Sequence, residues 1–486
     1  MKLGKDQIAD IVTRVAARLE AGKDDCEERG MGDDAGKASL APDDGIGLYD
    51  TLEEAVAAAK ASFVSLGAMS LEARKRIIDS MRAVIRAQIR PLSEMAVSET
   101  GYGRVEDKVI KNTLAVDKTP GTEILNPQAF TGDNGIAIME RAPYGVIGSI
   151  APVTNPVATV ISNAIGMIAG GNAVVFNAHP AAKGITGRVI SLFNSAIIKA
   201  GGPANLITAV RVPTIQTAQE LMKHPDIRLL CVTGGPAVVK VAMNSGKKAI
   251  CAGPGNPPVV VDETANIDDA ARHIVAGASF DNNIVCVVEK EVICVDSVAG
   301  SLKEAMKKHG AFELNQMRIR KLEKLVIERA PSEPGDHGVI NKKWVGQDAA
   351  KILRAIGVET DEDVKLIILD VPKEHPLVKM EQLMPVLPIA RVKNVDEAID
   401  FALEVERGFG HTAVMHSTNI DNLSKMARVI NTSIFIKNGP AVAGLGFGGE
   451  GYTSFTIASP TGEGLTTALN FTRERRCTLK DRFRII

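Results

Sequence analysis

The stretch Val146-Ile-Gly-Ser-Ile-Ala-Pro-Val-Thr-Asn-Pro156 decides the fold class of this 486-residue chain. Residues 146–150 are apolar or small throughout, as expected of a strand that is buried on both faces. A helical pattern follows over residues 156–169, and a second apolar strand follows over residues 173–176. Strands that alternate with helices of this length pair in parallel through right-handed crossovers. The stretch therefore predicts a doubly wound α/β domain of the nucleotide-binding type.

The alternation continues along the chain in two series. The first series predicts helices over 182–200, 214–223 and 236–245, and strands over 206–210 and 227–232. The second series predicts strands over 258–261, 291–295, 365–369, 411–416 and 433–437, and helices over 267–279 and 395–406. A helix-rich opening over 51–98 precedes both. We therefore expect two α/β domains, within a length that has room for about three domains of roughly 150 residues.

Composition and charge exclude several classes of protein. Lys and Arg number 57 against 58 Asp and Glu, and aromatic residues make up only 4%, so nucleic acid is not an expected partner. No apolar run reaches the roughly 18 residues of a membrane span, and the N-terminus has no hydrophobic signal core. The six cysteines lack CxxC spacing and disulfide density, which indicates a reducing, cytoplasmic compartment. No metal-binding motif is present.

The two ends of the chain differ from its body. Residues 1–20 carry one apolar helical stripe, formed by Ile8, Ile11, Val12, Val15 and Leu19, and residues 21–44 are polar enough to predict a flexible linker. Such a helix either docks on its own domain, lies on a membrane surface or binds a groove of another protein. The basic stretch 468–486 favours a solvated face, with a strand or an oligomer contact as the alternative.

Two residues are candidates for chemistry. Cys286 follows the polar, turn-forming triplet Asp281-Asn-Asn283, which would place its thiol at the edge of an element where it can meet a substrate, whereas a buried small hydrophobe is the alternative. Asn155 lies after the first strand, where ligands of open α/β sheets gather. Its amide can stabilise an oxyanion, and it can equally cap the helix that starts at Pro156.

An ordered set of motifs resembles the aldehyde dehydrogenase superfamily. The set contains Pro152-Val-Thr-Asn-Pro156, Val232-Thr-Gly-Gly235, Gly253-Pro-Gly-Asn-Pro257, Cys286 and Glu381-Gln-Leu-Met-Pro385. Three further stretches resemble its CoA-acylating branch, the propionaldehyde and acetaldehyde dehydrogenases of bacterial microcompartments. They are 281–290, Gly410-His-Thr-Ala-Val414 and Thr461-Gly-Glu-Gly464.

The resemblance implies a fold with a Rossmann-type cofactor domain, a second α/β catalytic domain and a small β oligomerisation arm. It places the cofactor domain at residues 45–250, with an oligomerisation strand near 130–142, and the catalytic domain at 251–445. Residues 446–486 would form a C-terminal oligomerisation segment of a dimer or tetramer. The helix over 1–20 would be an encapsulation peptide that binds a shell or core protein, which puts the enzyme inside a microcompartment.

The resemblance also implies a mechanism. Cys286 would attack a short-chain aldehyde such as propionaldehyde or acetaldehyde, with Asn155 holding the oxyanion, and hydride transfer would leave a thioester. Cys251 stands where hydrolytic relatives carry a glutamate base, which favours transfer of the acyl group to CoA. A hydrolytic dehydrogenase that releases the free acid and a non-catalytic shell-associated scaffold remain as alternatives.

Cofactor residues follow from the same motifs. The implied cofactor contacts, to NAD in preference to NADP, are Thr154, Asn177, Thr233, Gly234, Gly253 and Glu381. Asn177 replaces the lysine that usually binds the ribose. His411 would contact the substrate or CoA, with a structural histidine as the alternative. No metal is expected.

Overall fold

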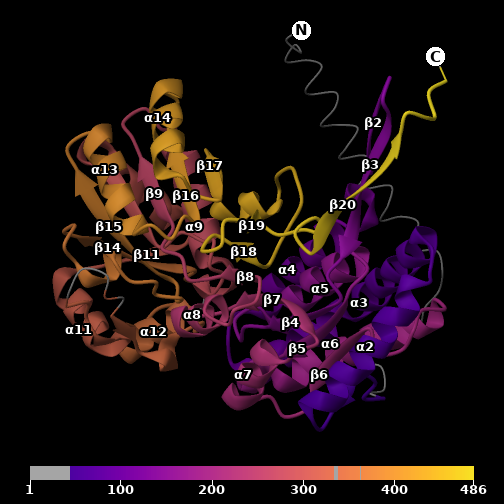
Figure 1. The fold of residues 1–486 in the computed structure, drawn as a ribbon. Helices are drawn as coiled ribbons and strands as arrows, with labels where there is room; N and C mark the ends of the chain where they lie inside the picture. Colours follow the sequence, from indigo (N-terminus) through magenta and orange to yellow (C-terminus); the bar gives the residue numbers. More distant parts are fainter. Residues whose placement is uncertain (1–43, 333–335, 337, 362, 486) are drawn as a thin grey trace, which may run out of the picture. The chain divides into compact units, whose positions relative to one another are not determined.

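Two large parallel sheets form the core of the computed structural model, which describes residues 44–332, 336, 338–361 and 363–485 (Figure 1). The first sheet has the strand order β1-β6-β5-β4-β7-β8. Its strands are β1 (Leu48–Tyr49), β4 (Val146–Ile150), β5 (Ala173–Asn177), β6 (Ile207–Val210), β7 (Ile227–Thr233) and β8 (Ala249–Ala252). The chain runs from β4 through β5 to β6 and then returns to the other side of β4 for β7 and β8. A topological switch point therefore lies beside β4.

The helices around the first sheet begin and end where local chemistry predicts. Helix α2 (Leu52–Gly67) starts at a capping box between Thr51 and Glu54. Helix α3 (Leu71–Thr100) ends at Gly101, whose φ of 70° suits a residue without Cβ. The other helices are α4 (Val105–Lys118), α5 (Pro156–Ala169), α6 (Lys183–Lys199), α7 (Ile215–Lys223) and α8 (Pro236–Met243). All 14 residues of α5 are buried, so this helix is a central element rather than a surface one.

The second sheet has the order β11-β14-β15-β10-β9-β16-β17, and all of its strand pairs are parallel. Its strands are β9 (Pro258–Val261), β10 (Glu291–Val295), β11 (Ala311–Leu314), β14 (Leu366–Val371), β15 (Val386–Val392), β16 (Thr412–His416) and β17 (Ile434–Lys437). Its helices are α9 (Ile267–Ser279), α10 (Asp296–Lys308), α11 (Gln316–Val326), α12 (Ala349–Ala355), α13 (Val395–Glu406) and α14 (Ile420–Ile430). Strands β9 and β10 are buried along their whole length, which explains the apolar sequence of residues 258–261 and 292–295, although β10 begins with the buried carboxylate of Glu291.

A small antiparallel sheet projects beside the first sheet (Figure 1). It consists of β2 (Gln128–Gly132), β3 (Gly135–Pro143) and β20 (Thr472–Lys480), in the order β2-β3-β20. Residues 472–480 of the basic C-terminal stretch form a strand that pairs with β3 along its whole length, which confirms the strand that was kept as the alternative. Its side chains are exposed from Arg473 onward, as the favoured interpretation of a solvated face predicted.

The body of the chain matches the α/β prediction closely. The predicted helices over 156–169, 267–279 and 395–406 and the predicted strands over 258–261 and 291–295 are confirmed to the residue. The predicted helix over 1–20 and most of the linker over 21–44 lie outside the described residues. The division into domains stays a prediction. None of the described helices is both long enough and apolar enough to cross a membrane.

Candidate active site

The carboxyl ends of four neighbouring strands open into one cavity of about 570 Å³. Its wall contains the residues that follow β4, β5, β7 and β8, which come together because parallel strands end at the same edge of a sheet. The facing wall comes from the loop before β10, with Ile284 and Cys286, and from Glu381. This is the position at which the sheet topology places a ligand.

The loop before Cys286 has an unusual backbone. Asp281, Asn282 and Asn283 have φ values of 48°, 53° and 65°, a region that Asp and Asn tolerate better than other residues with a side chain. Each of the three side chains anchors the loop through hydrogen bonds. The Asp281 carboxylate accepts a bond from the Arg104 amide (2.9 Å), Asn282 donates to the Gly346 carbonyl (2.9 Å), and Asn283 donates to the carbonyls of Ala278 and Glu289 (2.7 and 2.9 Å). The polar triplet therefore fixes the segment that carries Cys286.

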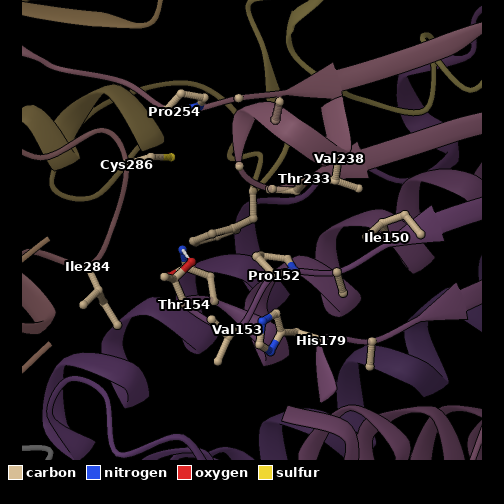
Figure 2. A pocket seen from close by; sticks show the side chains of 18 of the residues that line it. Ile150, Pro152, Val153, Thr154, His179, Thr233, Val238, Pro254, Ile284 and Cys286 are labelled. Carbon is tan, nitrogen blue, oxygen red and sulfur yellow. Dashed lines mark hydrogen bonds between the residues drawn. The ribbon is translucent and has the colours of Figure 1, made fainter. Parts of the chain in front are cut away.

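Cys286 is partly buried, and its sulfur points into the cavity opposite Thr154 (Figure 2). Burial raises the pKa of its thiol to about 12, and the Glu381 carboxylate adds to this shift, while the Lys290 and Lys111 ammonium groups oppose it. Lys290 is fully buried and donates to the carbonyl and the side-chain oxygen of Asn283 (2.8 and 2.5 Å). The structure thus places a thiol at the cavity, with cationic groups behind it.

Asn155 lies at the N-cap position of α5 but its side chain does not cap the helix. Its amide oxygen instead accepts a hydrogen bond from Lys111 Nζ (2.7 Å), and its amide nitrogen donates to Thr154 Oγ1 (3.3 Å). Asn155 and Thr154 both line the cavity that contains Cys286. The geometry therefore leaves the amide available to a ligand in the cavity.

All of the predicted cofactor residues line the cavity: Thr154, Asn177, Thr233, Gly234, Gly253 and Glu381. Asn177 is buried, and its side-chain oxygen accepts a hydrogen bond from Thr217 Oγ1 (2.7 Å). Thr233 Oγ1 pairs with Thr456 Oγ1 (2.9 Å). Gly234 has no room for a side chain, since a Cβ there would lie 2.7 Å from Val238 Cγ1. The cofactor roles of these residues stay predictions.

Two residues singled out in the sequence lie behind the cavity wall. His411 is buried. Its ring lies against Gly255, since a Cβ at Gly255 would come within 2.9 Å of His411 Cγ and 3.2 Å of the Cys286 carbonyl oxygen. Burial lowers its pKa to about 4. Cys251 is also fully buried, and burial with the nearby Glu463 carboxylate raises its pKa to about 11. Neither side chain lines the cavity, and a contact of His411 with substrate or CoA stays a prediction.

Three residues of the site, a histidine and two lysines, were not identified from the sequence. His179 follows β5 and lines the cavity, as does Lys342, which comes from a distant short 3₁₀-helix (Lys342–Trp344). Lys111 comes from α4 and reaches Asn155. The position of His179 after a strand was a usable signal, whereas nothing in the sequence around Lys111 or Lys342 indicates which strand end they approach. Within the described residues, no group of three or more His, Cys, Asp or Glu could hold a metal ion.

The aldehyde dehydrogenase family model matches residues 48–319 and 360–472 of this chain. The chain therefore belongs to the aldehyde dehydrogenase family, whose α/β fold the two sheets display. It is 52% identical to an acetylating acetaldehyde dehydrogenase of Bilophila wadsworthia over 445 residues, which cover 91% of this chain and 92% of that one.

Solved structures give the same picture. A propionaldehyde dehydrogenase of Rhodopseudomonas palustris, with bound CoA and an acylated cysteine, superimposes with a TM-score of 0.86 at 47% identity, covering 90% of this chain and 98% of that chain. A propionaldehyde dehydrogenase from the fucose utilisation microcompartment of Clostridium phytofermentans gives a TM-score of 0.87 at 44% identity, covering 91% of this chain and 100% of that chain.

Proposed function

We propose that the protein is a CoA-acylating aldehyde dehydrogenase that converts a short-chain aldehyde, NAD and CoA into an acyl-CoA and NADH. The Cys286 thiolate adds to the aldehyde carbonyl, and the oxyanion accepts hydrogen bonds from the Asn155 amide and the Cys286 backbone N–H. Collapse of the oxyanion transfers hydride to the nicotinamide and leaves a thioester on Cys286. A CoA thiolate then displaces the cysteine, which leaves as a thiolate and is ready for the next aldehyde.

One observation carries the choice of CoA over water as the acyl acceptor. Among the described residues that line the cavity, Glu381 is the single carboxylate, and the segment Ala252–Pro254 presents none. Cys251, which by the resemblance stands where hydrolytic relatives have their base, is buried and does not line the cavity. Glu381 is assigned to the cofactor ribose. The CoA thiol needs less activation than water, because its thiolate is a strong nucleophile.

The cavity fits a dinucleotide cofactor. It lies at the topological switch point of a parallel sheet, its wall is mostly apolar, and Thr154 and Thr233 place hydroxyl groups on it at strand ends. His179, whose pKa is lowered by burial, and the Lys342 ammonium group also line it. When bound, NAD supplies the hydride acceptor. The chain's own residues position the cofactor. Glu381 lies on the side of Cys286, because the charge of Glu381 raises the pKa of the Cys286 thiol.

The test of this function is the dependence of NADH formation on CoA. With propionaldehyde and NAD but no CoA, we expect about one NADH per active site and then arrest, because the thioester is not discharged. Adding CoA should restore continuous turnover with acyl-CoA as the product, identified by chromatography. Sustained NADH formation and free propionate without CoA would establish the hydrolytic alternative instead. No NADH under either condition would support the scaffold.

We also propose that residues 1–20 recruit the enzyme to a microcompartment, as the notable amphipathic stripe and the resemblance suggest. Asp44, the last residue of the linker predicted over 21–44, is described by the structure, and its carboxylate accepts hydrogen bonds from Ser191 and Ser195 of α6 (2.6 and 2.7 Å). A variant that lacks residues 1–40 should therefore keep its kcat and its melting temperature. It should lose co-purification with assembled shells, while residues 1–40 fused to a fluorescent protein should gain it. Retained co-purification of the truncated enzyme would overturn the proposal.

Association between copies is proposed for the β2-β3-β20 arm. Its outer strands leave backbone groups unpaired at both edges, and Phe130, Ile138 and Leu479 are exposed on it at 56%, 37% and 46%. An exposed strand edge with apolar side chains is a ready surface for a second copy of the chain. We propose a homo-oligomer built through this arm.

A further inference from the structure

Lys111 contacts Asn155 in the site, and the mechanism above gives this contact no role. Its ammonium group donates to the Asn155 amide oxygen (2.7 Å), and both side chains are buried, with 3% and 7% of their surface exposed. The same ammonium group pairs with the Asp281 carboxylate, which is fully buried. Lys111 therefore connects helix α4, the loop that leads to Cys286 and the residue that follows strand β4.

The contact fixes the orientation of the Asn155 amide. An amide presents an oxygen acceptor at one end and an NH₂ donor at the other. With the ammonium group on its oxygen, the NH₂ group must lie at the other end, on the side of Thr154 and the cavity. A flipped amide would set its NH₂ group against the Lys111 ammonium group in a buried place, and this ammonium group would lose its acceptor on Asn155. The cation also polarises the amide and so strengthens its N–H donors.

The position of Lys111 is itself held firmly. Asp281 also pairs with Lys108 (3.1 Å) and accepts a bond from the Arg104 amide (2.9 Å), and its own amide donates to Asp107 (2.9 Å). Because Asp281 starts the left-handed triplet before Cys286, the thiol and the Asn155 amide share one anchor. The two buried ammonium groups of Lys108 and Lys111 thus share one buried carboxylate.

We propose that Lys111 is a positioning residue that acts through Asn155: it aims the Asn155 amide at the oxyanion and keeps it in register with Cys286. This inference rests on the proposed function, since it assigns Asn155 to the oxyanion. It requires no contact between Lys111 and the substrate.

Lys108 provides a matched control. It lies one helical turn before Lys111 on α4, is equally buried and pairs with the same Asp281 oxygen, but in the described part of the chain it forms no hydrogen bond with Asn155. Replacing either lysine with methionine removes one buried ammonium group from the same cluster. The two variants should therefore have similar melting temperatures and differ in catalysis.

The experiment is a double-mutant cycle on the first hydride transfer, followed as NADH formation in a single turnover at saturating aldehyde. We expect K111M to slow this step about tenfold or more, part of the roughly 100- to 1,000-fold attributable to one oxyanion donor. K108M should slow it less than about threefold. In an N155A background, K111M should have almost no further effect, because its route of action is gone.

The outcomes distinguish the positioning role of Lys111 from the proposed active site with Cys286 and Asn155. If K111M slows the reaction by the same factor with and without Asn155, Lys111 acts on the thiolate or on the fold, and the positioning role is overturned. The same conclusion follows if K108M and K111M slow the reaction equally. If N155A and C286A themselves keep wild-type rates, the proposed active site is wrong, whatever Lys111 does.

Discussion

Replacing Cys286 with alanine is expected to lower the rate of NADH formation by about 10⁴-fold or more, with aldehyde, NAD and CoA all present. Without the thiol, no covalent adduct forms, so there is no oxyanion whose collapse can transfer hydride. Alanine is smaller than cysteine, and the side chain borders a cavity, so the fold should tolerate the change. The measurement is the absorbance of NADH over hours at high enzyme concentration.

Cys294 supplies the matched control for that variant. It is fully buried in β10 and does not line the cavity. Cys294→Ala removes the same sulfur from a core position, and we expect a loss of about 1 kcal/mol in stability with near wild-type kcat. A C286A variant that keeps more than about a tenth of the wild-type rate would show that another group is the nucleophile.

The second large effect is expected for Asn155→Ala. Removal of one oxyanion donor lowers kcat by about 100- to 1,000-fold with little change in the KM for the aldehyde, because the bond strengthens only as negative charge develops. The measurement is steady-state kinetics with saturating NAD and CoA. Asn163→Ala is the matched control, since Asn163 is a buried asparagine of the same helix that bonds Cys231 and Thr456 and does not line the cavity. It should lower stability but preserve kcat. A rise in KM with unchanged kcat in N155A would assign Asn155 to substrate binding instead.

Much of the fold was predictable because local patterns and burial agree. Strand β9 and residues 292–295 of strand β10 are continuous apolar runs, and they are buried on both faces of a parallel sheet. Helices α5 and α13 have clear boundaries, since Pro156 opens the first and Asn394 caps the second. Such signals lie within a few residues of the element that they define.

Strand β20 was not assigned because its sequence contains no signal of burial. Residues 473–476 are Arg-Glu-Arg-Arg, and both faces of the strand are exposed, so no apolar alternation marks it. Its pairing with β3 is a contact between segments that are far apart in sequence. The composition of this stretch indicates exposure, but it does not indicate which strand it pairs with.

The candidate site was likewise predictable only where the signal is local. Cys286 was indicated by the turn-forming triplet before it, and the positive φ values of residues 281–283 give that signal its physical basis. The competing explanation of Asn155 as a side-chain cap could be decided only once the contact with Lys111 was known. That contact depends on how α4 packs against the carboxyl end of β4, which no local pattern encodes.

The central claim is that Cys286 carries the acyl group and passes it to CoA. The most direct measurement is intact-protein mass spectrometry of the enzyme after a single turnover with propionaldehyde and NAD, before and after addition of CoA. We predict a mass increase of one propionyl group, mapped to Cys286 by peptide analysis, that persists without CoA and disappears on its addition as propionyl-CoA forms. An unmodified Cys286 during turnover, or a propionyl group lost to water as fast without CoA as with it, would contradict the account.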